Sequence, residues 1–214
     1  SWYRKAAEQG NALAQYSLGW SYRVGRGITQ DDVQAVYWFR KVAEQGDSIA
    51  QLQLGGMYYT GKGVTKDYSQ AIDWYRKAEE QQGLPEAQTM IALMYSEGHG
   101  VIQDYAQSIN WYRKAAKQGD FIALNNLGVM YQYGKGVSKN LVLAHMLYNL
   151  AAVNGDEDYI NNRNTLSRQL SSAQLSEAQA LAAKWKVGTP IPTSTKTFQT
   201  KSGKLNYKVQ ANKL

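Results

Sequence analysis

Residues 48–82 read SIAQLQLGGMYYTGKGVTKDYSQAIDWYRKAEEQQ, and this stretch holds the pattern that decides the fold. Its anchors are Ala50, the Gly-x-Gly pair at Gly61 and Gly63, and Trp74. Matching anchors return every 36 or 37 residues on both sides of the stretch. They are Gly25/Gly27, Gly61/Gly63, Gly98/Gly100 and Gly134/Gly136; Trp2, Trp38, Trp74 and Trp111; and Gly10, Gly46, Gly83, Gly119 and Gly155. Self-similarity at a fixed period of this length indicates a repeat architecture.

Each repeat carries two apolar stripes at helical spacing. One stripe has offsets of 0, 4, 5 and 8 and the other has offsets of 0, 3, 4 and 7, so each lies on one face of a helix. In the quoted repeat they are Ala50, Leu54, Gly55 and Tyr58, then Ala71, Trp74, Tyr75 and Ala78. An alternating strand period fits neither stripe. Every repeat therefore predicts a helix–turn–helix unit.

The ends of these helices carry matching signals. Asp or Asn precedes each second helix, where its side chain can accept a hydrogen bond from a free backbone N–H; these residues are Asp31, Asp67, Asp104 and Asn140. The first glycine of each Gly-x-Gly pair follows the first helix, where a left-handed residue commonly ends a helix. A small residue recurs in the middle of the first helix, at Gly19, Gly55, Ala92 and Gly128, and predicts close approach of two helices.

These motifs resemble the Sel1-like repeat family, a relative of tetratricopeptide repeats. The shared pattern is Ala-x-x-x-Leu-Gly-x-x-Tyr, Gly-x-Gly-Val, Asp-x-x-x-Ala and Trp-Tyr-x-Lys-Ala-Ala-x-x-Gly, and it covers about residues 1–156. The resemblance implies an all-α fold, an α/α solenoid in the form of a right-handed superhelix. The expected parts are the end of a preceding repeat (1–11), four repeats (12–47, 48–85, 86–120 and 121–156), C-terminal capping helices (157–187) and an irregular Lys/Thr-rich tail (188–214).

The last repeat departs from the pattern, with Leu147 in place of Trp and Leu150 in place of Lys. This drift is expected of a terminal repeat that shields its neighbours. Leu166, Leu170, Leu175 and Leu181 would then cover the open end of the core. For the tail, a flexible tail or an extended segment laid on the solenoid is favoured, and the alternative is a weak hairpin over 197–199 and 205–210.

The net charge of +7 belongs to the C-terminal part of the chain. From Ala178 onward there are seven Lys and no acidic residue, which leaves residues 1–177 with 17 basic and 17 acidic residues. One alternative function is therefore polyanion binding by this tail, to a glycan, nucleic acid or membrane surface. The widely spaced lysines and few aromatics favour a solubilising tail instead.

The sequence gives no positive support for an enzyme. His99 lies in a Gly-x-Gly loop and His145 beside a core position, and neither has the partners of a metal or catalytic site. The glycine pairs lack the Lys-Ser/Thr of a phosphate loop. There is no Cys to ligate a metal. We expect no catalytic residue, no metal and no cofactor, and a hydrolase is the remotest alternative.

The favoured hypothesis is a scaffold that binds a protein or peptide. The resemblance implies that first-helix offsets −1, 2, 6, 9 and 10 from the alanine anchor line the concave side. These positions are Leu13, Tyr16, Trp20, Arg23 and Val24; Ile49, Leu52, Gly56, Tyr59 and Thr60; Glu86, Thr89, Leu93, Ser96 and Glu97; and Ile122, Asn125, Val129, Gln132 and Tyr133. The candidate partner-binding residues among them are Tyr16, Trp20, Arg23, Leu52, Tyr59, Asn125, Gln132 and Tyr133. For the aliphatic members the alternative is packing between repeats, while Trp38, Trp74 and Trp111 are expected to be structural.

No specific nucleic-acid partner is expected, and no apolar run is long enough for a transmembrane segment. The resemblance implies roles in bacterial signalling, envelope assembly or host interaction. We therefore expect a periplasmic or extracellular location in a bacterium. Because the chain opens within a repeat, at Trp2-Tyr3-Arg4-Lys5, the natural protein is expected to begin upstream.

Overall fold

The structure is a computed structural model that describes residues 2–194. Within these residues the chain is helical and contains no strand. The helices are α1 (Trp2–Glu8), α2 (Ala12–Val24), α3 (Asp32–Glu44), α4 (Ser48–Thr60), α5 (Tyr68–Gln82), α6 (Pro85–Glu97), α7 (Tyr105–Lys117), α8 (Phe121–Tyr133), α9 (Leu141–Ala151), a 3-10 turn (Ala152–Asn154), α10 (Glu157–Ser167) and α11 (Ser172–Lys184).

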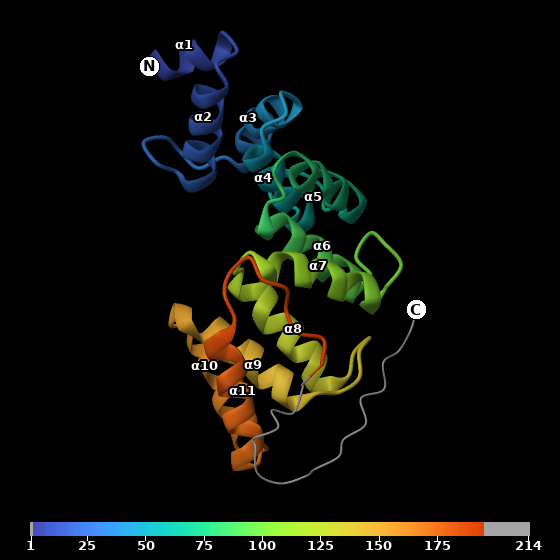
Figure 1. The fold of residues 1–214 in the computed structure, drawn as a ribbon. Helices are drawn as coiled ribbons and strands as arrows, with labels where there is room; N and C mark the ends of the chain where they lie inside the picture. Colours follow the sequence, from blue (N-terminus) through green and yellow to red (C-terminus); the bar gives the residue numbers. More distant parts are fainter. Residues whose placement is uncertain (1, 195–214) are drawn as a thin grey trace.

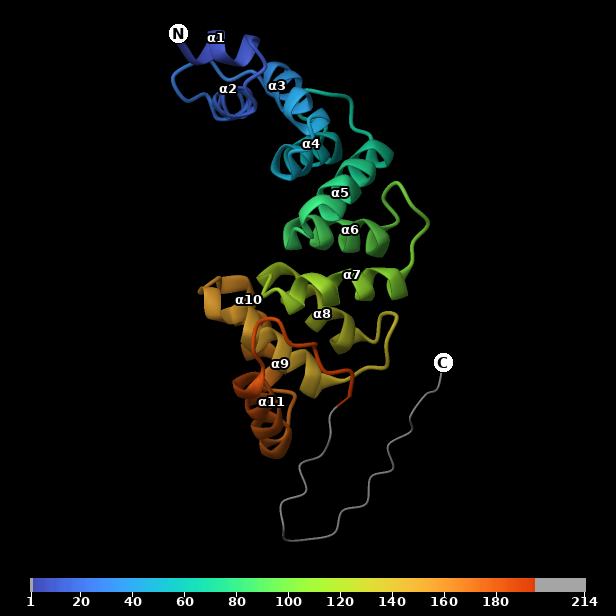
Figure 2. The ribbon, with the colours of Figure 1, turned by 45° about the horizontal axis from the view of Figure 1, so that its top comes forward.

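Consecutive helices from α1 to α10 pack against each other in chain order, and α11 packs against α9. Figures 1 and 2 show the pairs stacked from α1 at one end to α9, α10 and α11 at the other. Each predicted repeat is one helix pair: α2 with α3, α4 with α5, α6 with α7, and α8 with α9. The all-α solenoid expected from the repeats is confirmed.

The predicted caps begin the second helices. In α3, α5, α7 and α9 the Asx side chain accepts a hydrogen bond of 3.0 Å from the N–H three residues later. Three of the first helices begin in the same way, at Asn11, Asp47 and Asp120. Helix α6 instead follows Leu84, which makes no side-chain cap, and has Pro85 at its first position. Proline suits that position because its missing N–H would have no helical partner there.

The second glycine of each later Gly-x-Gly pair serves the stacking of repeats. A Cβ atom at Gly100 would lie 2.6 Å from the carbonyl oxygen of Tyr68, at the start of the second helix of the preceding repeat. Gly63 meets the carbonyl of Asp32 in the same manner, and a Cβ atom at Gly136 would lie 2.5 Å from the Cβ of Tyr105. The position at Gly27 has open space, since nothing lies within 4 Å of its Cβ. The absence of a side chain at these loop glycines therefore allows each repeat to pack closely against the preceding one.

The core runs along the inside of the helix pairs as a chain of apolar clusters. Trp38 and Trp74 are buried and Trp111 is half-buried, each packed against the preceding repeat, which confirms their structural role. The largest cluster joins α7, α8 and α9 and is closed by the C-terminal helices.

The end of the solenoid is covered partly as expected. Leu166 of α10 is fully buried in the last cluster and Leu181 of α11 packs against it. Leu170 and Leu175 are half-buried and do not belong to that cluster. The two segments suggested for a hairpin, 197–199 and 205–210, lie outside the described residues.

Candidate protein-binding surface

Large apolar side chains stand exposed along the outward side of the first helices. The exposed fractions are 74% for Leu13, 40% for Trp20, 47% for Val24, 39% for Ile49, 51% for Ile122 and 65% for Tyr133. All six occupy the outward offsets identified in the sequence. We call these six residues and the outward positions between them the first-helix face. Exposed apolar groups that gather on one side of a protein mark interaction surfaces more often than scattered ones do.

The N-terminal part of this face is built around Trp20. The guanidinium of Arg23 lies 5.4 Å from the centre of the Trp20 ring, and it donates a hydrogen bond to Oε1 of Gln53 on the next repeat. Tyr16 is half-buried, with its ring 5.4 Å from that of Phe39. Burial, the largest cause, raises the pKa of Tyr16. Trp20 is therefore exposed with the half-buried Arg23 beside it, whereas Tyr16 belongs mainly to the packing.

In the second repeat the two candidate residues take part in contacts within the chain. Leu52 packs against the cluster formed by α5 and α6, as the packing alternative anticipated. Tyr59 joins Tyr68 and His99 in a ring cluster, in which Tyr68 and His99 stack at 4.2 Å and the Tyr59 hydroxyl lies 3.3 Å from His99 Nδ1. This cluster joins the second helix pair to the loop after α6.

Thr89 was expected to point outward, and this prediction was wrong. Its side chain is 3% exposed and donates a 3.0 Å hydrogen bond to Oδ1 of Asp120. The same Asp120 oxygen also accepts from the N–H of Ala123 and caps α8. Burial is the largest cause that raises the pKa of Asp120. The Thr89 hydroxyl is buried because it donates to the Asp120 carboxylate, which caps α8 of the following repeat.

The fourth repeat contributes one exposed candidate. Asn125 Oδ1 accepts a 2.9 Å hydrogen bond from Asn162 of α10, and Gln132 Oε1 accepts one of 2.6 Å from Tyr148. Tyr133 is the candidate that remains exposed. Asn125 and Gln132 thus hold the end of the solenoid together.

A hollow of about 200 Å³ is lined by α6, α7, α8 and the loops that follow α6 and α8. Its lining residues are Leu93, Ser96, Glu97, Gln103, Tyr105, Tyr112, Asn126, Val129, Met130 and Lys135. The Tyr112 hydroxyl accepts a 3.2 Å hydrogen bond from Asn126, and burial above all raises the pKa of Tyr112 to about 12. Glu97 and Lys135 are exposed at the rim. The hollow can receive one side chain that has an apolar body and a polar tip.

His145 is a packing residue. It is 1% exposed, its Nε2 lies 2.8 Å from Ser167 Oγ, and its Nδ1 lies 3.3 Å from Asn149 Nδ2. Burial and, to a lesser extent, the charge of Arg163 lower its pKa. Across the described part of the chain, no three His, Asp or Glu side chains form a group that could hold a metal ion. Nor does any helix between residues 2 and 184 have the length and apolar character to cross a bilayer.

Two polar ladders between repeats were missed at the sequence level. In one, an arginine of the second helix donates to a tyrosine hydroxyl of the next repeat; the pairs are Arg4–Tyr22, Arg40–Tyr58, Arg76–Tyr95 and Arg113–Tyr131. In the other, buried Gln15, Gln51 and Gln88 each donate to the preceding repeat. The signal was present, because both residue types recur at the 36- or 37-residue period.

Comparison with known proteins identifies the repeat. The sequence model of the Sel1 repeat matches residues 1–11, 12–47, 48–82, 85–120 and 122–156, which together exceed half of the chain. Repeats of this kind are generally protein–protein interaction scaffolds. No curated protein matches the chain.

The solved structures that share this fold include two that are more than 35% identical to this chain over most of its length. One is a protective antigen present in uropathogenic Escherichia coli strains, 37% identical, with a TM-score of 0.74 over 86% of this chain and 40% of that one. The other is a Sel1 repeat protein from Oxalobacter formigenes, 36% identical, with a TM-score of 0.62 over 71% of this chain and 62% of that one. The chain thus spans less than two thirds of either protein. By its matched repeats and its fold, the chain belongs to the Sel1 repeat family.

Proposed function

We propose that this chain is a non-enzymatic scaffold that binds a protein or peptide along the first-helix face. The observation that carries the proposal is the placement of Leu13, Trp20, Val24, Ile49, Ile122 and Tyr133 at equivalent outward positions with large exposed fractions. A solenoid offers such positions along one extended surface, so one partner segment can contact several repeats at once.

The two ends of the face differ in chemistry. Leu13, Trp20, Val24 and Ile49 form an apolar N-terminal region in which Arg23 adds a cation beside the indole. Tryptophan and arginine are enriched among the residues that dominate binding energy at protein interfaces. Farther along, the hollow beside Tyr112 and Asn126 offers a polar contact at the end of an apolar space. The partner we propose therefore presents aliphatic or aromatic anchors to the first region and one larger side chain to the hollow.

We further propose that the protein acts in a bacterium outside the cytoplasm. Support comes from the bacterial origin of both similar structures, one of which is a protective antigen of E. coli. Fractionation of cells that express the natural protein tests this point. Recovery in the cytoplasmic fraction alone would contradict it, and recovery in the periplasm or medium would support it.

The binding proposal is tested with peptides selected on the unchanged chain from a displayed random library. A double variant, Leu13→Ser with Trp20→Ala, removes two exposed side chains from the first-helix face. We expect at least about a 10-fold loss of affinity, since truncation of interface anchors typically costs 1–2 kcal/mol or more. The matched control is Val33→Ser with Ile102→Ser, which removes exposed apolar side chains elsewhere, 63% and 90% exposed.

Equal loss in both double variants, or no loss in the first, would contradict the proposal. Circular dichroism of each variant checks that the fold survives. A steep fall of affinity with salt that depends on the lysines beyond Ala178 would instead favour the polyanion alternative.

A further inference from the structure

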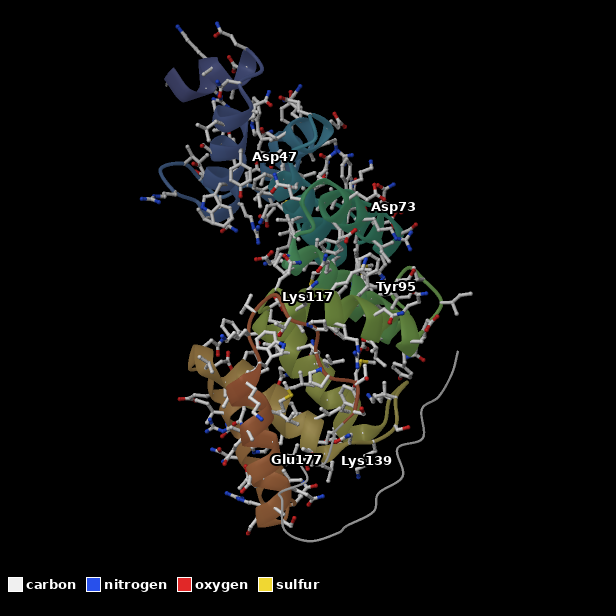
Figure 3. All side chains as sticks on the ribbon, in the orientation of Figure 1. Asp47, Asp73, Tyr95, Lys117, Lys139 and Glu177 are labelled. Carbon is white, nitrogen blue, oxygen red and sulfur yellow. The ribbon has the colours of Figure 1, made fainter. Side chains whose placement is uncertain are left out.

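After α11 the chain turns and runs back across the last repeat (Figures 1 and 2). The Trp185 indole N–H donates a 3.1 Å hydrogen bond to the carbonyl of Thr189, and the Thr189 hydroxyl donates one of 2.6 Å to the carbonyl of Lys186. The Gly188 N–H donates to the carbonyl of Lys117, at the end of α7, over 2.7 Å. Figure 3 labels Lys117 beside this turn. The segment therefore has defined contacts with a repeat about 70 residues earlier.

Ile191 anchors the segment. Its side chain is 4% exposed and lies in the apolar cluster of α7, α8 and α9. Its carbonyl oxygen accepts a 3.3 Å hydrogen bond from Arg113, whose guanidinium also donates to the hydroxyl of Tyr131. An aliphatic side chain and a backbone carbonyl are thus recognised together, as a groove recognises an extended peptide.

The earlier repeats have tryptophan at the position that Leu147 takes in α9. Trp74 is 7% exposed in the cluster of α3 and α4, and Lys77 lies 4.0 Å above its ring. Trp111 packs on α5 and α6, with Lys114 3.7 Å above its ring. The last repeat has Leu147 and Leu150 at these two positions, and both lie in the cluster that contains Ile191. Leucine has less apolar area than an indole, and Ile191 adds a further apolar side chain to the same cluster.

We propose that the groove under residues 187–191, formed by α7, α8 and α9, is a second peptide-binding site, and that the chain's own segment closes it. The site takes an extended segment with an aliphatic residue between two prolines, the pattern of Pro190-Ile191-Pro192. The prolines restrict the backbone before binding, which lowers the entropy lost on docking. A partner segment of this chemistry competes with residues 187–191.

This inference does not depend on the proposed function. The segment's hydrogen-bond partners are Arg113 and Lys117 of α7, and Leu147 of α9 lies in the same cluster as Ile191; none of these three residues belongs to the first-helix face. Variants of Leu13 and Trp20 should therefore leave it unaffected. A result that disproves one proposed binding site can therefore be distinguished from a result that disproves the other.

The test uses the full chain and a labelled peptide of residues 186–194. A tethered segment has an effective concentration on the order of 1 mM, so it blocks a free peptide of equal affinity. Ile191→Ser removes the internal anchor, and we expect the peptide to bind this variant at least about 10-fold more tightly than the unchanged chain. A peptide with Ser in place of its Ile should not bind, and Leu147→Trp added to Ile191→Ser should close the groove again.

A second readout needs no variant. Hydrogen exchange at the Gly188 amide reports whether the bond to Lys117 is made, and excess peptide should accelerate it in the unchanged chain. Two results would overturn the proposal: equal peptide affinity for the unchanged chain and Ile191→Ser, or no binding and no change in Gly188 exchange up to about 5 mM peptide, well above the tethered concentration.

Discussion

A Cβ atom added at Gly55 would lie 2.8 Å from ring carbons Cδ1 and Cε1 of Tyr75. The two residues belong to α4 and α5, and the same approach occurs between Gly128 of α8 and Tyr148 of α9. The third repeat has Ala92 at this position, in the same cluster as Tyr112, so a methyl group is accommodated there. The glycine in the middle of the first helix thus sets how closely a helix pair packs.

Gly55→Ala should destabilise the chain by about 1–3 kcal/mol, because the methyl group forces the Tyr75 ring or the helix pair to shift. Its neighbour is a matched control, since a Cβ at Gly56 meets only the Tyr75 hydroxyl, at 3.7 Å. Gly56→Ala should be neutral or stabilise by up to about 1 kcal/mol through helix propensity. Urea denaturation of both variants measures the difference. Equal effects of the two substitutions would show that steric contact with Tyr75 is not the cause.

The arginine–tyrosine ladder should contribute to the coupling between repeats. Tyr95→Phe removes the hydroxyl that accepts a 3.0 Å hydrogen bond from Arg76, in a partly buried setting, and should cost about 1 kcal/mol of unfolding free energy. Tyr22→Phe removes the equivalent bond from Arg4 at an exposed site and should cost less than about 0.5 kcal/mol. Thermal or urea unfolding measures the stability lost in each variant. A larger loss for Tyr22→Phe than for Tyr95→Phe would show that burial does not determine the strength of these hydrogen bonds.

Stability should fall on mild acidification because of His145. Burial lowers its pKa in the folded chain below the ordinary value of 6.5, so the unfolded chain binds more protons as the pH drops through that value. The free energy of unfolding is then lost progressively below about pH 7 until the folded pKa is reached. His145→Gln should make the dependence between about pH 7 and pH 5 shallower. Urea titrations at several pH values measure the free energy of unfolding of both chains. If it depends on pH equally in the two, His145 is not the cause of the acid destabilisation.

The fold was predictable because its signals are periodic and local. The alanine anchors, the Asx caps at Asp31 and Asp67, and the glycine pairs each act within one repeat, so a single period reveals them all. The outward positions were harder to assign. Spacing places Thr89 on the same face as Trp20, but the hydrogen bond from Thr89 to Asp120 of the next repeat buries it. Contacts across repeats decide exposure, and helical spacing does not report them.

The C-terminal segment is a second part of the structure that its own sequence does not predict. Residues beyond Gly188 have no period, so nothing in their own pattern indicates where Ile191 docks. The usable signal lies elsewhere, in Leu147 and Leu150, where the last repeat replaces a tryptophan and a lysine with apolar residues. Such a departure marks a helix that other parts of the chain cover. Here α11 and Ile191 supply the cover.

The most direct test of the first-helix face is photo-crosslinking from single exposed positions. A photoreactive residue is placed in turn at Leu13, Ile49 and Ile122, and, as matched controls, at Val33, Ile102 and Val153, all of which are exposed. Each chain is irradiated with a peptide selected on the unchanged protein, and mass spectrometry maps the adducts. We expect adducts from the first three positions and few from the controls. Adducts mainly from Val33, Ile102 or Val153, or equal yields from both sets, would contradict it.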